Sequence, residues 1–186
     1  MTFTTLPDDT LLMLAWRDGD EAAFAALYRQ HKQRLLRFLV HSTGSAASGE
    51  EVFQEVWLTL IRQRERYRTE AKFSTWLLEI AHSRLVDWYR RNQRHQWDHD
   101  LSAAANIPDH CPLPEAQAAN RQLQQQLSDC LRQLPPEQRE AFLFKEEYDL
   151  GLSEIAALTG RSAEAVKSRV RYAINKLRQC LGGDHE

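Results

Sequence analysis

Three residues near the C-terminus constrain the fold more than any other feature. Ala156, Gly160 and Val166 stand four and then six residues apart. A small residue at the first position lets two helices cross closely, glycine at the second permits a left-handed backbone at the turn, and valine at the third packs the second helix onto the first. This pattern predicts a helix-turn-helix between Leu152 and Leu181, whose second helix can enter the major groove of DNA.

Charge is distributed unevenly along the chain. The formal net charge of −2 does not by itself indicate a nucleic-acid-binding protein. Between Leu152 and Leu181, however, six basic residues stand against two acidic ones. Between Asp8 and Glu21, five acidic residues stand against the single base Arg17. This asymmetry favours a basic DNA-binding face and an acidic face for another partner.

Apolar periodicity predicts helices along most of the chain, and no alternating pattern typical of strands is found. Residues 95–114 break this periodicity and contain three prolines, which indicates a linker. We therefore expect an all-α fold of two small helical domains, residues 1–94 and residues 115–186. The helix-turn-helix lies in the second of them.

Capping residues predict where several helices begin. Asp20, Ser153 and Ser162 are each suited to accept backbone N–H bonds at a helix start. Ser48 and Glu51 have the spacing of a capping box, which places another helix start after a turn of small residues.

The sequence predicts a cytoplasmic protein without membrane insertion. The N-terminus lacks a basic stretch followed by an apolar run, and no segment approaches ~18 uninterrupted apolar residues. Cys111, Cys130 and Cys180 are odd in number and have no CxxC spacing, so we expect reduced thiols.

One cluster leaves open an alternative function as a metal protein or enzyme. It lies in the predicted linker and comprises His95, Asp98, His99, Asp100, His110 and Cys111. These residues have no recognisable ligand spacing and no helical frame, and the chain lacks a glycine-rich phosphate loop and a nucleophile elbow. We therefore expect no metal site, no cofactor and no catalytic residue, whereas stoichiometric metal in the purified protein would favour the alternative.

The last helix and the segment between residues 62 and 91 carry chemistry suited to nucleic acids. In the last helix, arginine, lysine, serine and asparagine side chains lie opposite an apolar face, and such groups read base edges or contact phosphates. The other segment interleaves bases with aromatic rings, on which unpaired nucleobases can stack. We expect Phe73 and Trp88 in the core, and Trp76 is the best candidate for an exposed stacking platform.

An acidic stripe precedes this aromatic segment. Glu51, Gln54, Glu55 and Leu58 share one face of a helix, at i, i+3, i+4 and i+7 spacing. Composition alone favours a solvated face over a binding surface.

With these segments laid out, the chain resembles bacterial sigma factors of the extracytoplasmic-function (ECF) type. The family's first domain resembles residues 18–92, which include EEVFQEVWLTL and FSTWLLEIAHSRLVDWYRR, and its second resembles residues 131–181. The resemblance implies an alternative sigma factor that binds core RNA polymerase, directs it to promoter DNA and helps melt the duplex, without an active site of its own. It further implies control by an anti-sigma factor.

The resemblance also implies roles for single residues. In the family, an acidic D-x-x-Q-E helix binds the clamp helices of the largest polymerase subunit, which maps onto Glu51, Gln54, Glu55 and Leu58. A loop and the following helix melt and read the minus-ten element, where a flipped base enters a pocket; they map onto Arg66, Arg68, Lys72, Trp76, Glu79, Ser83 and Arg90. The last helix reads the minus-thirty-five element, which maps onto Arg161, Lys167, Ser168, Arg169, Arg171 and Tyr172.

The chain departs from the family's usual residues at a few of these positions. Glu79 stands where many members have arginine or another polar residue, Ser83 where they have asparagine, and Arg171-Tyr172 where His-Arg is common. These departures bear on which promoter is read and not on the class. The rival class is a stand-alone helix-turn-helix regulator, which tight duplex binding by the free protein would favour.

Overall fold

The computed structural model describes residues 9–95 and 116–182, which form helices and no strand. The N-terminal half comprises α1 (Asp9–Arg17), α2 (Glu21–Thr43), α3 (Ala46–Arg62), the 3-10 helix η1 (Arg64–Arg66) and α4 (Phe73–His95). The C-terminal half comprises α5 (Ala116–Arg132), α6 (Pro136–Tyr148), α7 (Leu152–Thr159) and α8 (Ala163–Cys180). The predicted all-α fold class is confirmed. No helix within these ranges is long and apolar enough to cross a membrane.

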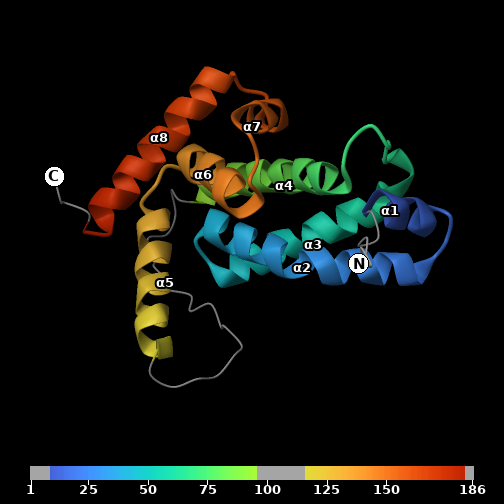
Figure 1. The fold of residues 1–186 in the computed structure, drawn as a ribbon, viewed down its shortest axis with the longest axis horizontal. Coiled ribbons are helices and arrows are strands. Elements are labelled where there is room, and N and C mark those ends of the chain that lie inside the picture. The colour runs from blue at the N-terminus through green and yellow to red at the C-terminus, as the bar shows by residue number, and fades with distance from the viewer. Residues whose placement is uncertain (1–8, 96–115, 183–186) are drawn as a thin grey trace, which may run out of the picture.

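Helices α2, α3 and α4 lie alongside one another, and α1 packs on α2 at one end (Figure 1). Their apolar residues are buried at helical spacing, as on α3, where Val52, Val56 and Leu60 are fully buried. Residues four apart lie on the same side of a helix. The polar residues between them on α3 are therefore turned away from the core.

Helix α3 begins earlier than the sequence predicted. Ser45 is its N-cap and accepts a bond from the backbone N of Ser48 at 3.4 Å, so the predicted capping box of Ser48 and Glu51 is wrong. The small residues that indicated a turn serve a close helix crossing instead. A Cβ added at Gly49 would lie 2.7 Å from the Cα of Val40, which belongs to α2.

Two of the three other predicted caps are confirmed. Asp20 and Ser162 accept backbone N–H bonds at the starts of α2 and α8, at 2.8 and 3.2 Å. Ser153, by contrast, lies inside α7, so its predicted capping role is wrong. The start of α7 is closed by Glu154, whose Oε2 accepts from the backbone N of Gly151 at 2.8 Å.

Helices α7 and α8 form the predicted helix-turn-helix (Figure 1). Gly160 ends α7 with a φ of 65°, in the left-handed region that glycine adopts without strain. Ala156 is 9% exposed and Val166 is fully buried. All three residues of the sequence pattern therefore have the structural roles expected of them.

Cys130 and Cys180 form a disulfide that ties α5 to the end of α8. The expectation of reduced thiols is wrong for this pair, and Cys111 lies outside the described residues. The pairing has no local motif because the two cysteines are 50 residues apart. The packing of α5 against α8 brings their Cα atoms to 5.8 Å, within reach of a disulfide.

The two halves pack against each other, α2 on α6 and α4 on α7. Phe38 of α2 stacks on Phe144 of α6 with a ring separation of 4.9 Å, and both are fully buried. Nearby, Nδ1 of His82 on α4 lies 2.7 Å from Oε1 of Glu140 on α6. Burial lowers the pKa of His82, but the hydrogen bond and the charge of Glu140 raise it by more, so it stands above its ordinary value even though Arg161 also lowers it.

We expect loss of the disulfide to destabilise the protein. A bridge that closes a loop of about 50 residues contributes about 4 kcal/mol to the free energy of unfolding in the chain-entropy description. Urea unfolding with and without dithiothreitol would measure the difference. Cys180→Ser, at an exposed position, should match the reduced wild type and should not respond to the reductant. Equal stability of oxidised and reduced wild type would contradict the expectation.

The pair of His82 and Glu140 should make stability depend on pH. Because the native pKa of His82 is raised, the contribution is fully present below about pH 6.5, the ordinary value for histidine, and is lost as the pH rises through the native pKa. We therefore expect the unfolding free energies of wild type and His82→Gln to differ most at mildly acidic pH and to converge as the solution becomes alkaline. Urea unfolding of both proteins over this range tests the pair, and a difference independent of pH would argue against it.

Candidate functional site

The acidic stripe of α3 lies on a side of the helix that the core leaves open. Glu51, Gln54 and Leu58 are exposed, and the apolar Leu58 leaves 50% of its surface to solvent. Glu55 is half-buried because Nη2 of Arg91 on α4 bonds its Oε1 at 3.0 Å. The structure therefore brings the four predicted polymerase-binding residues together on one surface, which we call the α3 face.

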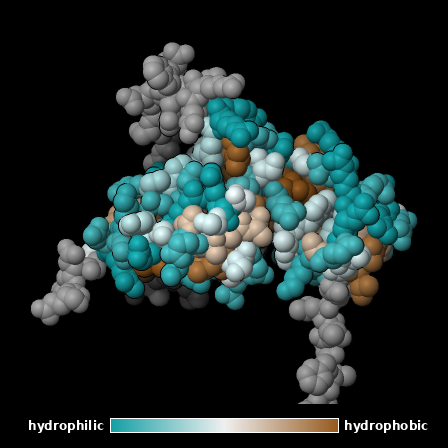
Figure 2. All heavy atoms as spheres, turned by 90° about the horizontal axis from the view of Figure 1, so that it is seen from above, coloured by the Kyte–Doolittle hydropathy of each residue, from teal (hydrophilic) through white to brown (hydrophobic). Residues whose placement is uncertain are grey.

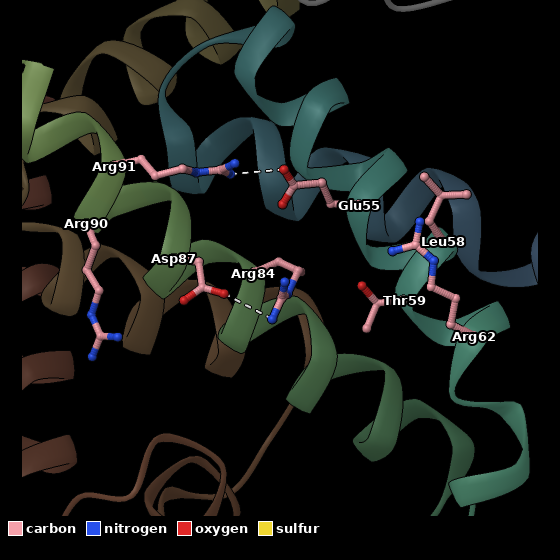
Figure 3. Close-up of a pocket in the computed structure, with 8 residues that line it drawn as sticks. All are labelled: Glu55, Leu58, Thr59, Arg62, Arg84, Asp87, Arg90 and Arg91. Atoms are coloured by element: carbon pink, nitrogen blue, oxygen red, sulfur yellow. Dashed lines mark hydrogen bonds and ion pairs between the residues drawn. The ribbon is translucent and has the colours of Figure 1, made fainter.

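A groove of ≈ 590 Å³ runs beside the α3 face, between α3 and α4. Figure 3 shows Arg91 reaching across this groove from α4 toward Glu55. Farther along α4, Nη2 of Arg84 lies 3.0 Å from Oδ2 of Asp87. Neither Arg84 nor Asp87 was singled out from the sequence, although their i, i+3 spacing indicates a shared helix face. Two ion pairs, Glu55 with Arg91 and Arg84 with Asp87, therefore line the groove beside the α3 face.

The loop after α3 is held by one buried tyrosine. Tyr67 is 2% exposed, and its hydroxyl donates to the backbone O of Ala71 at 2.9 Å. This bond ties the loop to its own far end. Arg66 and Arg68 flank the tyrosine and are exposed, as is Lys72 at the start of α4, so the three predicted basic residues of the loop all face solvent.

The outer side of α4 continues from this loop. Trp76, Glu79, Ser83 and Arg90 follow one another at intervals of three, four and seven residues, which places them on one side of the helix. The last three are exposed, and Trp76 is half-buried. We call the loop and this side of α4 together the α4 face; it contains all seven predicted minus-ten residues.

The aromatic residues of α4 depart in part from the sequence predictions. Phe73 is fully buried, as predicted. Trp88, which was also expected in the core, is only half-buried and packs beside Tyr89 with ring centroids 5.2 Å apart. The ring of Trp76 lies 5.3 Å from that of Tyr67. The platform expected at Trp76 is therefore partly covered by its neighbour and partly open to solvent.

Most of the predicted minus-thirty-five residues lie on the open side of the helix-turn-helix, which we call the α8 face. The exposed ones are Arg161, Lys167, Arg171 and Tyr172, and the half-buried ones are Ser168 and Arg169. The guanidinium carbon of Arg171 lies 5.3 Å from the centre of the Tyr172 ring, a cation–π contact that restrains the arginine. The molecule seen from the side of α7 and α8 is mainly hydrophilic, with smaller hydrophobic patches (Figure 2).

A carboxylate that was not predicted also belongs to this region. Glu137, in the first turn of α6, accepts a hydrogen bond from Nη2 of Arg169, and its Oε1 lies 4.0 Å from Nη2 of Arg161. Each oxygen of Glu137 therefore faces one arginine of the α8 face, which limits the conformations of both. No sequence signal pointed to Glu137. Its two arginine partners lie beyond α7, too far along the chain for a spacing pattern within one helix to reveal the pairing.

Within residues 9–95 and 116–182, no group of three or more His, Cys, Asp or Glu side chains could hold a metal ion. The cluster on which the metal or enzyme alternative rests lies, beyond His95, outside the described residues. Metal analysis of the purified protein is therefore still the test of that alternative.

Comparison with known proteins identifies the family of the chain. Residues 27–95 match the family "Sigma-70 region 2", and residues 124–177 match "Sigma-70, region 4". The RNA polymerase sigma factor CarQ of Myxococcus xanthus is 33% identical over 172 residues, which cover 91% of this chain and 95% of CarQ. The ECF RNA polymerase sigma factor RpoE of Cereibacter sphaeroides is 32% identical over 174 residues, which cover 92% of this chain and 94% of RpoE.

Two solved structures share the fold. The sigma factor RpoE from Bartonella quintana, in complex with the anti-sigma factor NepR, gives a TM-score of 0.71 at 20% identity and covers 87% of this chain and 98% of its own. CnrH, in complex with the cytosolic domain of CnrY, gives a TM-score of 0.68 at 21% identity and covers 96% of this chain and 99% of its own. The chain belongs to the ECF sigma factors, which are not enzymes but transcription initiation factors that direct RNA polymerase to promoters.

Proposed function

We propose that three faces of the chain divide the work of promoter recognition. The α3 face binds core RNA polymerase, the α4 face binds the minus-ten element and helps open the duplex there, and the α8 face reads the minus-thirty-five element. The linker, residues 95–114, joins the two DNA-binding domains, residues 1–94 and 115–186.

The observation that carries this proposal is the exposed α3 face beside the α4 face. A regulator that acts without polymerase needs only α7 and α8, and it gives no reason for an exposed leucine among carboxylates on α3 or for exposed bases around a half-open tryptophan on α4. Rings and bases in that arrangement suit unpaired nucleobases, which occur where a duplex has been opened.

Two further statements complete the proposal. We infer an anti-sigma factor as a partner, since the RpoE structure described above is in complex with one, and CnrH is in complex with the cytosolic domain of CnrY. We also place the protein in the cytoplasm, where bacterial polymerase and promoter DNA are found.

The test is run-off transcription with purified core polymerase, this protein and fragmented genomic DNA, followed by sequencing of the transcript starts. New starts that share two upstream elements are the expected result. If an active core gives no new starts while the free protein binds duplex DNA tightly, the stand-alone regulator is the better description.

We expect the triple substitution Glu51→Ala, Gln54→Ala, Glu55→Ala to weaken binding of core polymerase by about tenfold or more, which corresponds to about 1.4 kcal/mol. The reason is that it removes the polar groups of the α3 face without touching the buried side of the helix. Fluorescence anisotropy with labelled protein would measure the affinity. Glu146→Ala, an exposed acid on α6 and so outside the α3 face, is the matched control. Unchanged affinity of the triple variant would remove the α3 face from the proposal.

Arg171 and Lys167 should differ in what they contribute to the minus-thirty-five contact. Arginine can bond two atoms of a guanine, so we expect Arg171→Ala to relax preference at one base pair by about 1–3 kcal/mol. Lys167→Ala should weaken all sequences alike and lower the salt slope by about one. Competition between duplex variants for the holoenzyme distinguishes the two. Uniform weakening by Arg171→Ala would make that residue a phosphate contact.

A further inference from the structure

The carboxylate of Glu137 lies between two arginines of the helix-turn-helix. Its Oε2 accepts a hydrogen bond from Nη2 of Arg169 on α8, and its Oε1 lies 4.0 Å from Nη2 of Arg161, in the turn between α7 and α8. Glu137 itself belongs to the first turn of α6. All three residues lie in the C-terminal half, so this contact is made within one half of the chain and does not depend on how the two halves pack.

The backbone under both arginines is fixed, so only their side chains can change partners. The backbone N–H of Arg161 donates to the O of Ala156 at 3.0 Å, and Arg169 lies within α8 next to the buried Val170. The side chains of Arg161 and Glu137 are 55% and 61% exposed, and that of Arg169 is 21% exposed. A phosphate that approaches the α8 face therefore meets the same guanidinium groups that Glu137 now holds.

The other basic residues of the α8 face are not held in this way. Lys167 lies 3.9 Å from Glu164 on its own helix, and both of these side chains are largely exposed. Arg171 contacts the ring of Tyr172 and has no ion pair with a described residue. Within the part of the chain that the structure describes, Glu137 is therefore the one carboxylate that reaches this face from another helix.

The pairing changes the local charge more than it changes the stability of the fold. An ion pair with an exposed carboxylate contributes at most about 1 kcal/mol to the free energy of unfolding. A duplex carries one phosphate charge for about every 1.7 Å of its axis, and phosphate contacts supply essentially all of the affinity for non-specific sequences. A carboxylate offers two oxygens to a guanidinium as a phosphate does. Glu137 therefore competes with phosphates for the two arginines and repels phosphates by its charge.

We propose that Glu137 is a positioning residue, which lowers the affinity of the α8 face for the phosphates of any duplex by holding Arg161 and Arg169. The inference rests on the proposed function for the assignment of the α8 face to DNA. Phosphate contacts carry no sequence information, and base contacts such as that expected of Arg171 are not affected. Glu137 therefore sets how much of the binding free energy is independent of sequence.

The test compares Glu137→Gln with Glu146→Gln in the full chain. Both substitutions remove one negative charge from α6 with little change in shape. Glu146 is the matched control because it is exposed, lies toward the other end of the helix and has no ion pair with a described residue. Fluorescence anisotropy with a fluorescein-labelled duplex of random sequence, repeated over a series of salt concentrations, gives the affinity and its salt slope.

We expect Glu137→Gln to bind the random duplex about three- to fivefold more tightly than Glu146→Gln at low salt, with a salt slope steeper by about one. The slope becomes steeper because arginines that no longer share a carboxylate neutralise phosphates more completely. Equal affinity and equal slope of the two variants would overturn the proposal. Weaker binding by Glu137→Gln would also overturn it, because the carboxylate would then hold the arginines in the orientation that DNA requires.

A second comparison asks whether the carboxylate acts through its two arginines. In a protein that already carries Arg161→Gln and Arg169→Gln, adding Glu137→Gln should strengthen binding no more than adding Glu146→Gln does. A gain that persists in this background would show that Glu137 acts without the arginines and would overturn the proposal. Urea unfolding of each variant establishes that the proteins compared are folded.

Lys167→Ala distinguishes failure of this inference from failure of the proposed function. If Lys167→Ala leaves duplex binding unchanged, the α8 face is not the DNA contact, and the proposed function is overturned together with the role of Glu137. If Lys167→Ala weakens binding as expected but Glu137→Gln behaves as Glu146→Gln does, only the role of Glu137 is overturned.

Discussion

Helix α2 packs on more than one side, and helices of both halves of the chain lie against it. On one side, α2 crosses α3 so closely at Val40 that Gly49 of α3 has no room for a Cβ. On another, Phe38 stacks on Phe144 of α6. A helix with apolar residues beyond a single stripe must be covered on more than one side. The C-terminal half is the part of the chain that covers the second side of α2, and the positions of the α4 and α8 faces follow from that packing.

The parts of the fold that sequence reasoning could predict are those set by neighbours along the chain. The helix-turn-helix was predicted because Gly160 and Val166 lie only six residues apart, in the turn and in the helix that follows it. The caps at Asp20 and Ser162 were predicted for a similar reason, since each bonds a backbone N–H within three residues of itself. The contacts that were missed join distant segments: the disulfide of Cys130 and the pairing of Glu137 across α7. A spacing pattern contains no information about which helix lies opposite, so these contacts needed the packing itself.

The α3 start shows how one local signal can have two physical meanings. Small residues mark turns because they tolerate unusual backbone conformations, and they also mark places where two helices approach closely. In this chain the second meaning applies at Gly49, which lies inside α3 although the sequence predicted that the small residues around it form a turn before the helix. The sequence alone could not choose, because the deciding neighbour is the backbone of α2.

Glu79 places an exposed negative charge on the α4 face, where the other charged residues predicted for the minus-ten element are basic. It is exposed, and it has no ion pair with a residue of the described chain, whereas Asp87 farther along α4 is neutralised by Arg84. A carboxylate without a basic partner is repelled by phosphate, but it can accept from the amino group of cytosine. If the α4 face contacts melted DNA, Glu79 therefore penalises a backbone contact and rewards one particular base, so it acts on promoter choice rather than on affinity.

The three paired carboxylates of α6 differ mainly in exposure, and this difference separates an ion pair that can exchange its partner from two that resist it. The side chain of Glu137 is 61% exposed, whereas those of Glu140 and Glu147 are 9% and 11% exposed. An exposed ion pair contributes little and can exchange its arginine for a phosphate without movement of the helices. A buried pair resists removal of one partner, because the charge left behind has lost its water. The arginines at Glu137 can therefore turn to a phosphate without movement of α6, whereas freeing the bases paired with Glu140 and Glu147 would leave a buried carboxylate unpaired.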